Sequence, residues 1–245
     1  LYPAYAATRT GDFLIGRGVA DNKAAAILGL HLMRMLREAD VSLKHGLRLV
    51  LGLAEETGMK DMEHFMARET APVVSLIPDA GFPVNFAQKG TLRGKIEIPA
   101  GDQIAEFAGG EADNMVPPHA HALVRVDADA VRAAFCRLGL PEAEFDVEPD
   151  DGLTRVTAHG IAAHAAAPQN GKSAIHLLAS ALAESELLSG GSQAAMDAIA
   201  CMTGDFYGAN AGIDCEDPET GKTTMVLGVA MCCDAKIRLH LDCRL

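Results

Sequence analysis

The sequence predicts an α/β protein with two domains, and two observations lead to this prediction. Over residues 13–80, short apolar segments typical of buried strands alternate with helical segments, the order found around largely parallel sheets. After about Lys89, polar and apolar residues alternate with period two, as in half-exposed strands, and amphipathic helices follow. We therefore expect a mostly parallel sheet in residues 1–88 and a separate α+β domain in residues 89–245.

The first domain is expected to begin with a strand, Phe13–Ile15, that leads through a glycine loop into a helix over residues 23–38. Apolar residues recur on one face of this helix: Leu28, Leu32, Met35 and Leu36. HGLRLVLGLAEE, residues 45–56, predicts a buried strand, and residues 59–69 predict a short helix. VVSLIPDAG, residues 73–81, predicts a third strand.

In the second domain, the alternating segments predict strands over residues 90–100, 121–129 and 151–160. Residues 130–140 and 173–188 have the pattern of amphipathic helices. The glycine-rich segment 201–224 is expected to be a long loop or a hairpin.

Acidic residues follow three of the predicted strands in the first domain. Asp21 comes after the first strand, Glu55 and Glu56 end the second, and Asp79 ends the third. In open α/β sheets, ligands bind beyond the carboxyl ends of the strands, so these acids are expected to converge at one edge. Several clustered carboxylates are best neutralised by divalent cations. Taken singly, however, an Asp at a helix start is more often an N-cap, and a pair of Glu residues before a glycine is more often part of a solvated turn.

Composition excludes several classes of function. The formal net charge is −12, which argues against nucleic acid or an anionic membrane as a partner. Trp is absent and aromatic residues make up 4%, so a platform for stacking bases is not expected. No apolar run is long enough to span a bilayer. The six cysteines contain no C-x-x-C pair, which favours reduced thiols in a cytoplasmic protein.

Five motifs occur in order along the chain: GRGVADNK, LGLAEETGMKD, IPDAGFPVNFAQKG, NMVPP and GIAAHAAAPQNGKSAI. Together they resemble the dinuclear zinc exopeptidases, a family that includes acetylornithine deacetylase, succinyl-diaminopimelate desuccinylase, carnosinase and the PepV-type dipeptidases. The resemblance covers nearly the whole chain and is closest to the PepV type. It implies that residues 1–88 are part of a metal-binding catalytic domain. Residues 89–245 would then form a lid that binds substrate and is incomplete at its C-terminal end.

The same resemblance implies roles for individual residues of the first domain. Asp21 would bridge two divalent metal ions, Glu56 would bind one of them and Asp79 the other. Glu55 would be the general base. Zinc is the expected metal, with manganese or cobalt as alternatives.

In the lid, Asn114 and His164 would contact the substrate, and His164 would also polarise its carbonyl group. Arg244 would hold the substrate's terminal carboxylate. Asp113 and Glu111 are either contacts for a substrate ammonium group or solvated loop acids. His240 begins an H-x-D sequence, but it lies in a predicted strand at the far end of the lid, so we do not assign it to the metals.

The chain departs from the family pattern in several places, one of them Ala24, which stands where a Gly is frequent. Asn22 stands where a second Asp is usual, which would alter the support around the metals. The histidine ligands that the family supplies from an upstream H-x-D strand and from a downstream segment are not recognised. We therefore expect the chain to be a piece of a longer protein, and residues 1–245 alone to bind metal poorly and hydrolyse little.

The predicted function is that of a metal-dependent dipeptidase acting on small unblocked dipeptides. The alternatives are a deacylase or desuccinylase of N-acyl amino acids, with the same metal centre, and a non-catalytic homologue that acts as a binding module. A small peptide is the expected partner. The protein is expected to be a monomer, or a homodimer formed through the lid.

Overall fold

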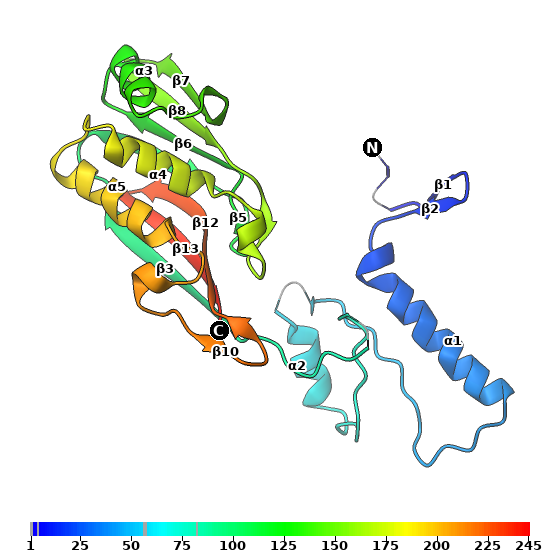
Figure 1. The fold of residues 1–245 in the computed structure, drawn as a ribbon. Helices are drawn as coiled ribbons and strands as arrows, with labels where there is room; N and C mark the ends of the chain where they lie inside the picture. Colours follow the sequence, from blue (N-terminus) through cyan, green and yellow to red (C-terminus); the bar gives the residue numbers. More distant parts are fainter. Residues whose placement is uncertain (1, 4, 56–57, 82) are drawn as a thin grey trace. The chain divides into compact units, whose positions relative to one another are not determined.

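The computed structural model describes residues 2–3, 5–55, 58–81 and 83–245. The chain divides into two compact units, Leu1–Phe86 and Ala87–Leu245. Each unit is described by itself below (Figure 1). None of the described helices is long and apolar enough to cross a membrane.

Unit 1 begins with an antiparallel hairpin of β1 (Thr8–Thr10) and β2 (Phe13–Ile15), in which Thr8 pairs with Ile15. A π-helical turn, η1 (Val19–Lys23), leads into α1 (Ala24–Glu38), and α2 (Lys60–Met66) follows. The predicted first strand and both helices are therefore confirmed to within a few residues. No residue of α1 or α2 is buried.

The mostly parallel sheet expected in residues 1–88 is not confirmed. The described parts of residues 45–56 and 73–81 contain no strand, and the strands of unit 1 that the structure describes pair antiparallel. Apolar side chains of these two segments are exposed, with Leu53 at 96% and Leu76 at 89%. A parallel strand needs a hydrogen-bonded neighbour and cover on both faces of its sheet, and the described residues of unit 1 supply neither for these segments.

Unit 2 contains a seven-stranded sheet in the order β3-β13-β12-β4-β6-β8-β7, and every neighbouring pair in it is antiparallel. Its strands are β3 (Thr91–Pro99), β4 (Ile104–Gly109), β6 (His119–Val124), β7 (Phe145–Asp150), β8 (Leu153–His159), β12 (Thr224–Cys233) and β13 (Lys236–Arg244). Two-stranded pairs join β5 (Met115–Val116) to β9 (Ala163–His164) and β10 (Glu216–Asp217) to β11 (Gly221–Lys222).

The helices of unit 2 lie along this sheet (Figure 1). They are α3 (Ala128–Arg137), α4 (Ala174–Glu184) and α5 (Gly190–Thr203), with short 3-10 turns at η3 (Glu142–Glu144), η4 (Pro168–Asn170) and η5 (Ala209–Ala211). Asp127 caps α3 by accepting hydrogen bonds from the amides of Asp129 and Ala130, and Ser173 caps α4.

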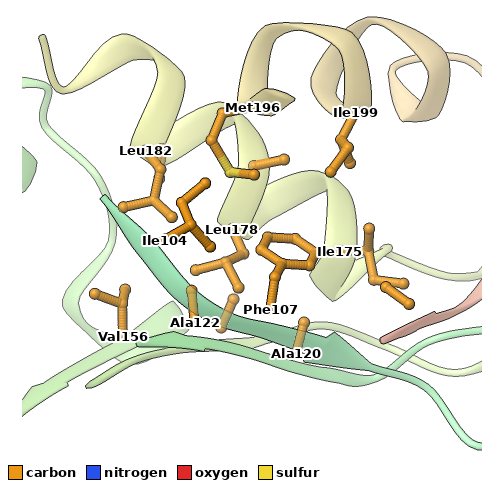
Figure 2. Close-up of a cluster of buried hydrophobic side chains, with 14 of the residues drawn as sticks. Ile104, Phe107, Ala120, Ala122, Val156, Ile175, Leu178, Leu182, Met196 and Ile199 are labelled. Atoms are coloured by element: carbon orange, nitrogen blue, oxygen red, sulfur yellow. The ribbon is translucent and has the colours of Figure 1, made fainter. Parts of the chain in front are cut away.

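The core of unit 2 lies between the sheet and helices α4 and α5 (Figure 2). Ile175 and Leu178 of α4 and Phe107 of β4 are fully buried there. The predicted strands at 90–100 and 151–160 and the helices at 130–140 and 173–188 are confirmed. The strand expected at 121–129 ends at Val124. Segment 201–224, expected to be a loop or hairpin, begins with the end of α5 and includes the β10–β11 hairpin. The large antiparallel sheet and its covering helices make the protein a mixed α/β fold.

Candidate active site

The glycine loop of unit 1 presents Asp21 at the entrance to α1. Gly18 has a φ of 70°, a conformation that glycine adopts without strain. The amide of Lys23 donates to the carbonyl of Gly18 at 2.8 Å, and its Nζ donates to the carbonyl of Arg17 at 2.7 Å. These bonds close the turn and leave Asp21 exposed, with extended backbone angles rather than those of a helix.

Asn22 connects this loop to Asp79. Its Nδ2 donates to Asp79 Oδ1 at 2.9 Å and to the carbonyl of Pro78 at 3.0 Å. The residue next to Asp21 therefore contacts a second predicted metal ligand that lies 57 residues away. An ionised Asp at position 22 has no donor and could not make these bonds, which gives the departure from the family pattern a structural role.

The segment before Glu55 is held by Asp61, a residue that the sequence did not single out. The Asp61 carboxylate accepts hydrogen bonds from the amides of Leu53 at 2.5 Å, Ala54 at 3.2 Å and Met62 at 2.9 Å. The bond from Leu53 is the main reason why the pKa of Asp61 lies below its ordinary value. Glu55 is exposed, and Glu56 lies outside the described residues.

The carboxylates of unit 1 are hard oxygen donors of the kind that divalent cations accept. Within the described residues, no group of three or more His, Cys, Asp or Glu side chains could hold a metal ion. Asp21 and Asp79 are thus chemically suitable donors, but the described residues do not form a complete site.

Unit 2 joins Asn114 to His164 through a short pair of strands. In the β5–β9 pair, Met115 is opposite His164, and the amide of Ala165 donates to the carbonyl of Asn114 at 2.9 Å. The Nδ1 atom of His164 accepts from the amide of Ala166 at 3.1 Å. Two predicted substrate residues that lie far apart in the sequence are therefore on adjoining segments.

Thr224 connects the same segments to Arg244. Its hydroxyl is buried and donates to the carbonyl of Ala165 at 2.8 Å. Thr224 is also opposite Arg244 in the β12–β13 ladder. The backbone of the His164 loop is thus tied to the strand pair that carries Arg244. No motif singles out Thr224, because its link to Ala165 spans 59 residues and its pairing with Arg244 is set by strand register.

Arg244 lines a hollow of about 470 Å³ in unit 2. Its other lining residues include Lys89, Thr91, Ala166, Glu219 and Thr220. Lys89 donates from Nζ to the carbonyl of Lys222. The hollow therefore has Arg244 in its wall and borders Ala166, two residues after His164.

Asp113, expected to be either a contact for a substrate ammonium group or a solvated loop acid, contacts His240 within unit 2. Its Oδ1 lies 2.9 Å from Nδ1 of His240 on β13. This contact fastens the loop that carries Asn114 to the sheet. The other ring nitrogen of His240 is buried without a partner among the described residues.

The chain matches Peptidase family M20/M25/M40 over residues 2–235. It belongs to this family. The family expected from the five motifs is therefore confirmed, and with it a peptidase relationship.

All six cysteines are free thiols.

Two curated relatives illustrate the match within the M20/M25/M40 family. The chain is 27% identical over 235 residues to "Putative dipeptidase YtjP" of Bacillus subtilis (strain 168), covering 92% of this chain and 50% of that protein. It is 28% identical over 176 residues to a "Putative dipeptidase" of Staphylococcus aureus (strain USA300), covering 67% of this chain and 38% of that protein. The chain thus spans half or less of the length of these relatives.

Proposed function

We propose that the protein containing this chain is a metal-dependent dipeptidase that hydrolyses small unblocked dipeptides. The observation that carries the proposal is the linked arrangement in unit 2, where Asn114, His164 and Arg244 are connected through Ala165 and Thr224. It supports a site that holds a short substrate by its carboxylate and by its scissile carbonyl. The names of the curated relatives favour a dipeptide among the possible substrates.

In unit 1, Asp21, Glu56 and Asp79 would hold two divalent ions, zinc first and manganese or cobalt as alternatives. Bound metals in two-metal hydrolases lower the pKa of water and so supply a nucleophile at neutral pH. Asn22 would keep Asp79 in place through its hydrogen bond at 2.9 Å. The hydrogen bonds of Asp61 would likewise fix the segment that carries Glu55 and Glu56.

Glu55 would act as the general base: it takes a proton from the attacking water and returns it to the leaving amine. His164 would donate a hydrogen bond to the developing oxyanion; its Nδ1 already accepts from the Ala166 amide, so Nε2 is the donor. Asn114 would contact the substrate beside His164. Arg244 would bind the terminal carboxylate in the hollow that it lines.

The proposal concerns the whole protein, which we place in the cytoplasm as a monomer or as a dimer formed through unit 2. For residues 1–245 alone, without a recognised histidine ligand, we expect weak metal binding and little hydrolysis. The experiment that tests the function uses the full-length protein, stripped with a chelator and then supplied with zinc, manganese or cobalt.

Free α-dipeptides, β-alanyl-histidine and N-acyl amino acids are offered as substrates, and the released amines are quantified. Metal-dependent cleavage of free dipeptides supports the proposal. Preference for N-acyl amino acids assigns the protein to the deacylase alternative. Absence of turnover with every metal, in a folded protein that binds metal, overturns the enzyme proposal in favour of a binding module.

A further inference from the structure

Asp242 on β13 is a completely buried carboxylate shared by two arginines. Its Oδ1 lies 2.6 Å from Nε of Arg244, and its Oδ2 lies 3.2 Å from Nη2 of the same residue. Nε of Arg93 on β3 lies 3.1 Å from Oδ2. Asp242 has no exposed surface, whereas the Arg93 side chain is 58% exposed. A carboxylate buried to this degree is costly unless its charge is paired, as it is here.

The contacts of Arg244 use each of its three guanidinium nitrogens but not all of their hydrogens. Nε and Nη2 form the two-bond fork to Asp242, and Nη1 donates to Thr91 Oγ1 at 3.1 Å. A guanidinium has one N–H on Nε and two on each terminal nitrogen. After these contacts, which involve only described residues, one N–H remains on Nη1 and one on Nη2. These two N–H groups can donate to a second carboxylate.

The backbone explains why these residues meet. Side chains two apart on a strand share a face, so Asp242 and Arg244 lie side by side on β13. In the β3–β13 ladder, Asp242 is opposite Arg93 and Arg244 is opposite Thr91. Asp242 is therefore placed beside Arg244 by spacing along β13, and Thr91 is placed there by sheet register.

We propose that Asp242 is a positioning residue for substrate recognition. It holds the guanidinium of Arg244 so that the remaining N–H pair faces an incoming terminal carboxylate. The inference rests on the proposed function, since it concerns the substrate's carboxylate. If Asp242 were needed only to pair buried charge, its substitution would not change the preference for a substrate with a terminal carboxylate over one with a neutral terminus.

The test compares two substrates on the full-length, metal-restored protein: L-alanyl-L-alanine and L-alanyl-L-alaninamide. The ratio of their kcat/KM values measures recognition of the terminal carboxylate. Both values come from the same sample, so partial unfolding lowers both and leaves the ratio unchanged. Asp242→Asn keeps the size of the side chain and removes its charge. Arg93→Gln is the matched control, because it removes the other arginine on the same carboxylate.

For Asp242→Asn we expect the carboxylate-to-amide ratio to fall roughly tenfold to a hundredfold, the scale of a lost charge-assisted fork. The fall should come from a higher KM for the dipeptide, with the rate on the amide unchanged. Arg93→Gln should keep the wild-type ratio. A ratio within about twofold of wild type in Asp242→Asn, or an equal fall in Arg93→Gln, would overturn the inference.

If Asp242→Asn yields no folded protein, Asp242→Glu tests the same fork. Glutamate keeps the charge but is longer by one methylene, so it moves the carboxylate relative to the Arg244 guanidinium. A fall of the carboxylate-to-amide ratio by roughly tenfold or more in Asp242→Glu supports the inference, and a wild-type ratio overturns it. Wild-type protein that cleaves peptides without preferring the carboxylate overturns this inference alone, whereas wild-type protein that cleaves no substrate overturns the proposed function and the inference with it.

Discussion

Helices α1 and α4 have similar apolar patterns but opposite surroundings. On α1, Leu28 and Leu32 remain 63% and 59% exposed. On α4, Ile175 and Leu178 are fully buried against the sheet and α5. An amphipathic pattern specifies a helix and its apolar face, but burial depends on a second layer to pack against. Unit 2 supplies that layer, whereas the described residues of unit 1 do not cover α1.

The candidate site follows the same contrast. In unit 2, Arg244 and Thr224 sit on paired strands, so their positions depend on sheet register. In unit 1, Asp21, Glu55 and Asp79 lie on turns and extended segments that individual side chains hold in place. The proposed chemistry thus depends on unit 1 for proton transfer and on unit 2 for substrate binding, and four predictions test this comparison.

The largest expected effect is on catalysis. In full-length, metal-restored protein, Glu55→Gln should lower kcat by about 10²–10⁴-fold, the usual contribution of a general base, with KM nearly unchanged. Steady-state kinetics on a cleaved dipeptide checks this. Glu63→Gln, an exposed carboxylate on α2, is the control and should keep wild-type kcat. A change in KM alone, or equal losses in both variants, would contradict the division of roles between the units.

The next effect is on stability. Leu178→Ala should lower the free energy of unfolding by about 2–5 kcal/mol, because it leaves a cavity in the core of unit 2. Leu32→Ala on α1, 59% exposed, should change it by less than about 0.5 kcal/mol. Urea unfolding of residues 1–245 followed by circular dichroism measures both. Comparable losses of unfolding free energy in the two variants would show that α1 is packed in solution and would contradict the contrast between α1 and α4.

A smaller and local effect is expected at Asp61. Asp61→Asn should raise hydrogen exchange at the amides of Leu53 and Ala54 roughly threefold to tenfold, because neutral acceptors bind more weakly than a carboxylate. The pKa of Asp61 is lowered in the folded chain, chiefly by the Leu53 amide. The stabilisation that the ionised Asp61 contributes to the folded state is therefore present above pH 3.8 and is lost as the pH falls through the folded pKa.

The difference in hydrogen exchange between Asp61→Asn and wild type, at the Leu53 and Ala54 amides, should therefore become smaller below pH 3.8. Exchange measured by mass spectrometry or NMR at several pH values checks this. Glu63→Gln, in the same helical turn, should leave exchange at the Leu53 and Ala54 amides unchanged. Equal exchange in Asp61→Asn and wild type at neutral pH would mean that this turn does not depend on Asp61.

The smallest effect concerns His176 on α4. Burial lowers the pKa of His176 below 6.5, and its Nδ1 lies 3.0 Å from the Thr203 hydroxyl. Between the folded pKa and 6.5 the unfolded chain binds the proton and the folded chain does not, so stability falls as the pH drops below 6.5. Urea midpoints at pH 7.5 and 5.5 should differ less in His176→Gln than in wild type. His31→Gln on exposed α1 should show the same difference between the two urea midpoints as wild type. The same difference in His176→Gln as in wild type would contradict the lowered pKa of His176.

The local elements and the family could be predicted from the sequence. The approximate boundaries of α1, α2 and α4 follow from the spacing of apolar residues, a pattern that spans only a few positions. The motifs around Asp21, Glu55 and His164 were recognisable because each is a short contiguous pattern. Segments 45–56 and 73–81 were predicted as strands because their composition suits a buried sheet, but a strand also requires partners.

Contacts between residues far apart in the chain could not be predicted from the sequence. Arg93 and Asp242 are 149 positions apart, and Thr224 and Ala165 are 59 apart. Their contacts depend on the order and register of a sheet whose neighbours are mostly not consecutive in the chain. Strand pairing is chosen by the packing of the whole layer, so no local pattern around Asp242 or Thr224 could reveal its partners.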